Sequence, residues 1–475
     1  MAKVELTTRR RNFIVAVMLI SAFVAILNQT LLNTALPSIM RELNINESTS
    51  QWLVTGFMLV NGVMIPLTAY LMDRIKTRPL YLAAMGTFLL GSIVAALAPN
   101  FGVLMLARVI QAMGAGVLMP LMQFTLFTLF SKEHRGFAMG LAGLVIQFAP
   151  AIGPTVTGLI IDQASWRVPF IIIVGIALVA FVFGLVSISS YNEVKYTKLD
   201  KRSVMYSTIG FGLMLYAFSS AGDLGFTSPI VIGALIISMV IIYLFIRRQF
   251  NISNALLNLR VFKNRTFALC TISSMIIMMS MVGPALLIPL YVQNSLSLSA
   301  LLSGLVIMPG AIINGIMSVF TGKFYDKYGP RPLIYTGFTT IMLCFLHTDT
   351  SYTYLIVVYA IRMFSVSLLM MPINTTGINS LRNEEISHGT AIMNFGRVMA
   401  GSLGTALMVT LMSFGAKIFL STSPSHLTSN EIKQQSIAIG VDISFGFVAV
   451  LVMIAYAIAI FIREPKEIES NRRKF

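Results

Sequence analysis

The charged residues of two short segments repeat in type and spacing along this 475-residue chain. The first segment is residues 73–80, the second is residues 326–333, and each lies between two long apolar runs. Carboxylates next to basic side chains at the ends of two helices can bridge charges across the mouth of a helix bundle, holding one conformation closed and letting another open. The candidate gating residues, which could also be simple topology anchors, are Asp73, Arg74, Arg78, Asp326, Lys327 and Arg331.

The composition places most of this chain in lipid. Hydrophobic residues make up 56% of it and charged residues 11%, and the mean hydropathy is +0.82, so a polar surface could not cover it as a soluble globule. A helix needs about 20 mostly apolar residues to span a membrane. The sequence predicts fourteen such helices, near residues 13–39, 51–72, 79–98, 101–130, 136–161, 167–189, 203–222, 227–246, 266–293, 299–321, 332–347, 352–376, 390–416 and 438–462.

The distribution of basic residues predicts the orientation. The formal net charge of +16 could suggest nucleic-acid binding, but the basic residues concentrate on alternate loops. With the N-terminus in the cytoplasm, the inward loops and tails hold 27 of the 34 Lys and Arg residues, as the positive-inside rule requires. We therefore predict a multi-pass membrane protein with both termini in the cytoplasm, the lipid bilayer around it and no nucleic-acid partner.

The repeat divides the chain into two similar halves. Its copies lie 253 residues apart. Arg108 and Arg362, at an offset of 254, and Gly136 and Gly389, at 253, extend the correspondence. Duplicated bundles are a common way to build transporters. The predicted fold is an all-α membrane protein with a six-helix bundle at 1–190, linkers and an extra helix pair at 191–265, and a second six-helix bundle with a tail at 266–475.

At these residues the sequence resembles the major facilitator superfamily, and within it the fourteen-helix drug:proton antiporter family of bacterial multidrug exporters. The first charged segment is similar to the superfamily's signature between helices two and three, except that Ala69 and Lys76 replace glycines; the second copy keeps them as Gly322 and Gly329. Further motifs match in the expected helices and order, at residues 27–37, 108–116, 153–158 and 394–404. The resemblance implies a major-facilitator-type fold in a bacterial inner membrane.

The resemblance assigns roles to residues in the fourth and fifth predicted helices. In the family, the arginine that matches Arg108 is tied to proton coupling, although it could instead extend to the nearby interface. A charge at the bilayer centre costs roughly 2.5 to 3.5 kcal/mol, so we expect polar partners for it. Gly153, Pro154 and Gly158 match the family's fifth-helix antiporter motif. The proline is expected to break that helix and the glycines to admit a close neighbour; the motif favours export.

One departure from the family concerns the proton carrier. The first-helix motif usually has an aspartate where this chain has Asn28, and none of the 18 acidic residues falls in the middle of a predicted helix. Proton relays deep in a membrane normally use acidic or histidine side chains. The candidates are Asp73 and, after it, Asp442 or Asp223. A cavity without an anionic centre is expected to favour neutral or weakly charged amphipathic compounds.

Polar side chains inside predicted helices are the candidate substrate contacts. Hydrocarbon would not accept them facing outward, so they either line a cavity or bond helices to one another. They are Asn28, Thr30, Asn33, Asn61, Gln111, Gln123, Gln147, Tyr291, Asn394 and Arg397.

These observations predict a transporter and not an enzyme, namely a proton-coupled multidrug efflux antiporter that works by alternating access. The expected partners are small-molecule drugs and protons, with the proton motive force as energy source; no cofactor, metal or obligatory protein partner is expected. The alternative on the same fold is a dedicated exporter or proton symporter for one endogenous solute. A membrane enzyme, a receptor or an ATP-driven pump is disfavoured, since the sequence has no nucleotide-binding loop, metal-ligand cluster or long extramembrane domain.

Overall fold

The computed structural model describes residues 7–161, 164–190, 194, 200–252, 255–296, 300–342, 351–422 and 429–462. All regular structure in these residues is helical, which confirms the predicted all-α fold. The helices are α1 (Thr8–Leu43), α2 (Glu47–Arg74), α3 (Thr77–Ala96), α4 (Phe101–Leu129), α5 (Arg135–Ile161), α6 (Arg167–Ser187), α7 (Lys201–Leu224), α8 (Pro229–Asn251), α9 (Arg265–Asn294), α10 (Ala300–Tyr328), α11 (Pro330–Met342), α12 (Tyr352–Asn379), α13 (Ile386–Thr422) and α14 (Ser429–Ala459), with short 3₁₀ turns η1 (Lys132–His134), η2 (Leu259–Lys263) and η3 (Asn383–Glu385).

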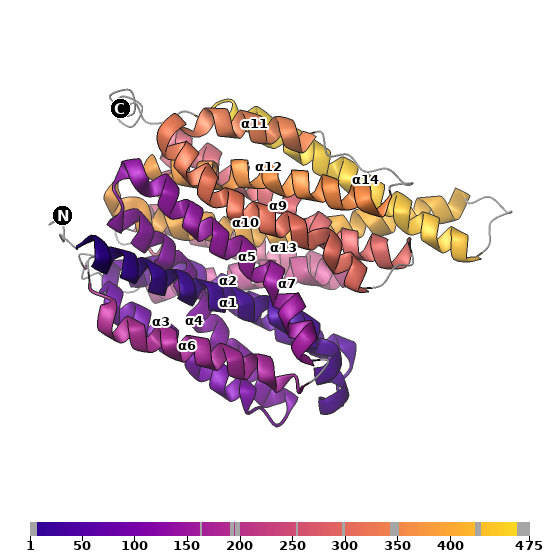
Figure 1. Ribbon diagram of the computed structural model, residues 1–475, viewed down its shortest axis with the longest axis horizontal. Coiled ribbons are helices and arrows are strands. Elements are labelled where there is room, and N and C mark those ends of the chain that lie inside the picture. Colours follow the sequence, from indigo (N-terminus) through magenta and orange to yellow (C-terminus); the bar gives the residue numbers. More distant parts are fainter. Residues whose placement is uncertain are drawn as a thin grey trace.

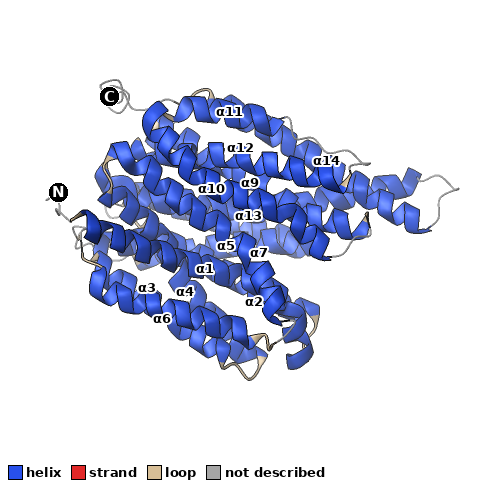
Figure 2. Cartoon of the chain, in the orientation of Figure 1, coloured by secondary structure: helices blue, strands red, loops and turns tan. Residues whose placement is uncertain are grey.

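The helices lie side by side along the long axis of the molecule (Figure 1), and helix dominates the chain throughout (Figure 2). The start of α1 and the end of α14 lie at the same end, which we call the terminal end. Each predicted span overlaps one α-helix of the structure. Twelve helices of the described chain are long and apolar enough to cross a membrane, and the other two are α5 and the short α11.

The doubled charged segment is mostly helical. Asp73 lies in the last turn of α2 and Arg78 in the first turn of α3, so only Ile75 and Lys76 connect these helices. In the second copy, Gly329 separates α10 from α11 with a φ of 82°, a left-handed conformation that glycine adopts without strain. Lys76, at the corresponding position, has a φ of −59°. The first copy therefore turns with a different backbone, which explains why a lysine can stand there.

Helices α1–α6, which we call the first half, meet helices α9–α14, the second half, along two seams. In the α5–α10 seam, a Cβ added to Gly136 would lie 2.6 Å from the carbonyl oxygen of Gly322, and one added to Gly140 would lie 2.6 Å from that of Ser318. The backbones of these helices are therefore in direct contact. In the α2–α13 seam, the counterpart of Gly322 is the buried Ala69. The α5–α10 seam thus has Gly322 at the position where the α2–α13 seam has Ala69.

Helix α7, which pairs with α8, packs across the α2–α13 seam. From α7, Tyr216 stacks on Trp52 of α2 with ring centroids 6.1 Å apart, and Phe211 meets Phe395 of α13 with centroids 4.3 Å apart. At the terminal end, the Asp200 carboxylate before α7 accepts hydrogen bonds from an arginine of α8, and these lower the pKa of Asp200 to about 2. Hydrogen bonds therefore join the start of α7 to the end of α8, and α7 contacts both α2 and α13.

The predicted break in the fifth helix is wrong. α5 runs without interruption from Arg135 to Ile161. Neighbouring helices can satisfy the groups that a proline leaves unbonded, so a membrane helix can continue through one. The expected close approach is present at Gly153, where an added Cβ would lie 2.4 Å from Oγ1 of Thr30 on α1. The side chains at positions 154 and 158, the other members of this motif, lie outside the described residues.

Replacing Gly322 by alanine tests the close seam. The new methyl group would lie 2.4 Å from the carbonyl oxygen of Gly136 and would push α5 and α10 apart; overpacking of this kind costs about 1–3 kcal/mol. We expect Gly322→Ala to lower the melting temperature of the purified protein. The control is Gly233→Ala, because nothing lies within 4 Å of that added Cβ. Equal melting temperatures for the two variants would contradict direct backbone contact.

Candidate functional site

The carboxylate of Asp326 lies at the first turn of a helix in the opposite half. Its Oδ1 accepts a hydrogen bond from the backbone N–H of Gly136 at 2.8 Å, and its Oδ2 accepts one from that of Phe137 at 2.8 Å. The first N–H groups of a helix have no partner within the helix and carry a partial positive charge. Asp326 therefore docks α10 on α5 through charge-assisted hydrogen bonds.

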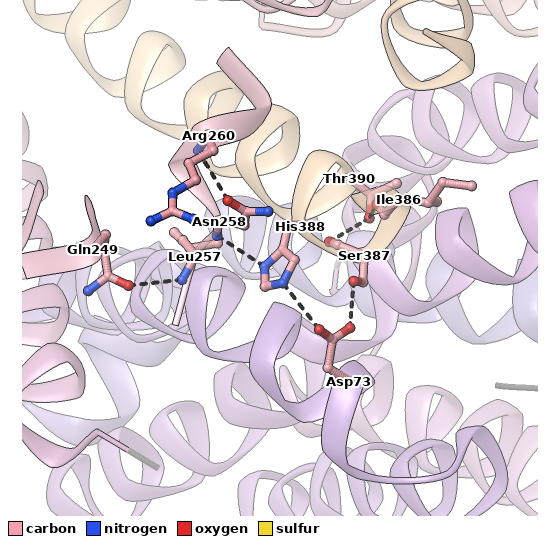
Figure 3. A network of polar contacts seen from close by, with 9 residues as sticks. All are labelled: Asp73, Gln249, Leu257, Asn258, Arg260, Ile386, Ser387, His388 and Thr390. Atoms are coloured by element: carbon pink, nitrogen blue, oxygen red, sulfur yellow. Dashed lines mark hydrogen bonds and ion pairs between the residues drawn. The ribbon is translucent and has the colours of Figure 1, made fainter. Parts of the chain in front are cut away.

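Asp73, its counterpart in the repeat, makes a similar contact with the first turn of α13 (Figure 3). Its Oδ1 accepts a hydrogen bond from Oγ of Ser387 at 2.6 Å, and its Oδ2 lies 3.1 Å from Nε2 of His388. The other ring nitrogen of His388 accepts a bond from the backbone N–H of Asn258, in the linker between α8 and α9, at 3.3 Å. Because Nδ1 accepts, we assign the imidazole proton to Nε2, which donates to Asp73.

The basic members of the doubled segment bind close to their own helices. Arg78 donates to the carbonyl of Leu185 at the end of α6, at 2.9 Å, and Arg74 donates to a neighbouring tyrosine hydroxyl. Lys327 lies over the ring of the next residue, and Arg331 is exposed. In these contacts, the two carboxylates bind the opposite half: Asp326 binds the start of α5, and Asp73 binds the start of α13.

Arg108 is fully buried in the first half. Its guanidinium donates to Oε1 of Gln111 at 3.0 Å and to the carbonyl of Leu53 at 3.2 Å, and lies 4.1 Å from the centroid of the Phe57 ring. Gln111 donates in turn to Ser92 at 3.0 Å. The arginine is therefore bonded inside the bundle, with the polar partner that the sequence places three residues later, and does not extend to an interface.

Two buried donors at this site, one on Asn28 and one on Arg108 itself, have no hydrogen-bond partner in the described part of the chain. The carbonyl of Asn28 lies 3.4 Å from the guanidinium and its Oδ1 lies 3.4 Å from Nε2 of Gln111, but Nδ2 of Asn28 and Nη2 of Arg108 make no hydrogen bond within the described chain. A buried charge without a counter-ion is costly. Asn28 stands where a carboxylate would supply that counter-ion.

A second polar cluster links the halves between α4 and α13. Nδ2 of Asn394 donates to Oε1 of Gln123 at 2.8 Å, and Arg397 donates to Oδ1 of Asn394. All three residues are buried. Nε2 of Gln123 has no hydrogen-bond partner in the described chain. The structure therefore brings three predicted substrate contacts together across the interface and leaves one donor there available.

The other predicted substrate contacts are dispersed. Thr30 bonds within its own helix, Asn61 lies against α4, Gln147 is half-buried and Tyr291 is buried. The side chain of Asn33 lies outside the described residues. These residues form no single cluster with the two described above.

Sequence reasoning misses two contacts between the halves. It does not pair His388 with Asp73, and it does not predict that Arg135 donates to Asn379 of α12 at 3.0 Å. A signal for both exists, because Arg135 and His388 lie 253 residues apart, in the register of the repeat. Aligning the two halves residue by residue would have placed both at the contacts made by the doubled segment.

Two helical bundles with buried arginines and amides between membrane-length helices define a membrane transporter. The model of the Major Facilitator Superfamily matches residues 18–405, and the chain belongs to this superfamily. It is a transporter and not an enzyme. The predicted resemblance to the drug:proton antiporter family is also confirmed, because relatives named as drug-resistance and multidrug transporters match most of the chain.

Three comparisons illustrate the similarity. Lincomycin resistance protein LmrB of Bacillus subtilis (strain 168) is 40% identical over 94% of this chain and 95% of its own length. Multidrug export protein EmrB of Escherichia coli (strain K12) is 27% identical over 82% of this chain and 78% of its own. The crystal structure of the human organic anion transporter MFSD10 (TETRAN) has a TM-score of 0.67 at 12% identity, covering 94% of this chain and 99% of that chain, which supports the fold.

Asn28→Asp should give Arg108 its counter-ion. Removing one partner of a buried ion pair costs about 3–5 kcal/mol, so supplying the missing partner should raise the melting temperature of the purified protein measurably. The control is Asn374→Asp, since the amide oxygen of Asn374 is bonded to the hydroxyl of Ser274 at 3.1 Å, and this change should lower the melting temperature. If both variants melt lower than the unmodified protein, Arg108 does not lack a counter-charge.

Proposed function

We propose that this protein is a proton-coupled multidrug efflux antiporter. It would export amphipathic, neutral or weakly charged drugs from the cytoplasm by alternating access between two six-helix halves, in a fourteen-span fold with α7–α8 as the inserted pair. The observation that carries the proposal is the docking of Asp73 and Asp326 on the opposite half, both at the terminal end of the molecule. We call these two carboxylate contacts the docks. An alternating-access transporter needs contacts of this kind at one end in order to close one mouth at a time.

The terminal end is the proposed cytoplasmic side. The doubled segment brings its basic residues there, and the positive-inside rule assigns such loops to the cytoplasm. If this end faces the cytoplasm, a molecule with both seams docked there would be closed toward the cytoplasm. Opening toward the cytoplasm would require α2 to leave α13, α10 to leave α5, or both. We call the α2–α13 contact at this end the cytoplasmic gate.

Asp73 is the proposed proton-binding residue. Its side chain is 21% exposed, so water can deliver a proton to it, and protonation would remove the negative charge that faces the start of α13. The dock would weaken as a result. Asp442, half-buried in α14, is the second candidate. The side chain of Asp223, the third, lies outside the described residues.

The proposed substrate class follows from the buried charges. Arg108, Arg362 and Arg397 are buried inside the bundle, whereas no acidic residue of the described chain is buried. An interior with cationic side chains and unpartnered N–H donors repels permanent cations and accepts carbonyl or hydroxyl oxygens. The names of the relatives, which refer to lincomycin resistance and multidrug export, support a drug substrate.

Efflux by everted membrane vesicles tests the function. We expect vesicles that contain this protein to accumulate several chemically unrelated neutral or weakly charged drugs, with far less accumulation of permanently cationic dyes. A protonophore should abolish this uptake. Transport of a single compound would favour the alternative, a dedicated exporter or proton symporter for one solute, and uptake that survives the protonophore would contradict proton coupling.

Asp73→Asn tests the proton-binding residue. The amide keeps the size of the carboxylate but cannot bind a proton or carry its charge, and hydrogen bonds to charged groups contribute about 1.5–3 kcal/mol. We expect roughly tenfold slower efflux, the factor that corresponds to about 1.4 kcal/mol. Glu384→Gln removes an exposed acid at the same end and should leave the rate unchanged. Undiminished efflux by the Asp73 variant, at equal amounts in the membrane, would exclude this role.

A further inference from the structure

Positions 135 and 388 occupy the same place in the repeat, directly before Gly136 and Gly389. Arg135 is the first residue of α5, and His388 lies in the first turn of α13. On the α5–α10 seam this place is therefore held by a side chain that is always charged. On the α2–α13 seam it is held by a histidine, the residue type that changes charge within the physiological pH range.

The two side chains also act differently on the docks. Arg135 reaches across to Asn379 of α12, while Asp326 binds the backbone beyond it. His388 is itself a partner of the docking carboxylate, at 3.1 Å from Asp73, and its side chain is 10% exposed. In the contacts given above, the side chain at this position binds the docking carboxylate directly on the α2–α13 seam and binds α12 on the α5–α10 seam.

His388 also joins the dock to the linker that follows the extra helix pair (Figure 3). Its Nδ1 accepts from the N–H of Asn258 at 3.3 Å, and the preceding residue, Leu257, donates its N–H to Gln249 at the end of α8 at 3.2 Å. Gln249 in turn donates to Ser203 of α7 at 2.7 Å. One imidazole therefore contacts α2 directly and also contacts a linker that is itself hydrogen-bonded to the end of α8.

The groups that face the imidazole set the sign of its response. α2 presents the Asp73 carboxylate, and η3 presents Glu385, which interacts electrostatically with His388. The linker presents the uncharged N–H of Asn258, while Arg260 donates to the carbonyl of Phe250 instead. An imidazolium at this place would be attracted to α2.

We propose that His388 is a positioning residue of the cytoplasmic gate: it holds Asp73 on α13, and a proton on its imidazole strengthens this seam as long as the Asp73 carboxylate is charged, whereas the Arg135 seam stays docked throughout the physiological pH range. The proposal rests on the proposed transport function, because a gate exists only if α2 leaves α13 during transport. It adds a second titratable group to the dock, beside the carboxylate.

The direction of the effect follows from linkage. An imidazolium at position 388 is attracted to the Asp73 carboxylate 3.1 Å away while the gate is closed, and it loses this attraction when α2 moves away, so a charged His388 favours the closed gate. Protonation also removes the bond from Asn258, but the linker leads into α9, which packs on α13, so that loss is common to the open and closed gates. Lowering the pH from 8 to 6 should therefore raise the ratio of closed to open gates.

Spin-label distances across the gate measure this ratio directly. The labels would be attached through Lys76→Cys and Asn383→Cys, both at exposed positions flanking the dock, in full-length protein in lipid nanodiscs with the two native cysteines replaced by alanine. We expect the short-distance population to grow as the pH falls from 8 to 6. His388→Gln keeps an amide that can donate to Asp73 but cannot be protonated, so its short-distance population should not grow as the pH falls.

Two further variants control for structural damage. His388→Arg copies the other seam and should keep the gate closed at both pH values. His134→Gln replaces an exposed histidine of η1 that contacts Ser131 at 3.1 Å, and it should keep the pH response of the unmodified gate. A gate that does not respond to pH, or a His388→Gln gate that responds as the unmodified one does, would overturn the proposal. Because distances are measured without transport, a failure of the efflux assay would leave this result interpretable on its own.

Discussion

The first turns of α5 and α13 impose the constraint on which the structure depends. The N–H groups at a helix start need acceptors, and they carry partial positive charge that favours anions. For α5 the acceptor is Asp326, and at α13 the facing carboxylate is Asp73, each from the opposite half of the chain. Asp326 therefore supplies acceptors for the first N–H groups of α5, and Asp73 binds two side chains of the first turn of α13. Water can replace such polar contacts at a membrane surface, whereas it cannot replace an apolar seal, so these docks can open without leaving groups unsatisfied.

The duplicated halves have diverged so that the two seams are unequal. The α5–α10 seam combines direct backbone contact at Gly136 and Gly322 with a permanent charge at position 135. On the α2–α13 seam, Ala69 replaces the glycine, a histidine replaces the arginine, and α7 contacts both helices. These differences point in one direction: the first seam suits a pivot and the second a gate. The repeat places a similar carboxylate contact on each seam, and the differences between the seams suit these contacts to different functions.

Composition and hydropathy were enough to predict the helices, because spanning segments must satisfy their backbone internally and carry apolar surfaces. The buried position of Arg108 and its bond to Gln111 also follow from local helical spacing. The dock partners do not, since His388 lies 315 residues from Asp73 in the chain and only the packing of α2 on α13 brings them together. The continuity of α5 was mispredicted because a proline's local effect is overridden by neighbouring helices. The register of the repeat was the one sequence signal that could have located both docks.

The central claim is that one seam opens while the other holds, and paired distances in the same preparation test it most directly. Spin labels at Lys76→Cys and Asn383→Cys report on α2–α13, and labels at Glu133→Cys and Tyr328→Cys, also exposed positions, report on α5–α10. When a transported drug is added at pH 8, the account predicts a longer-distance population across α2–α13 and an unchanged distribution across α5–α10. A distance that lengthens across α5–α10 while α2–α13 stays short would contradict it.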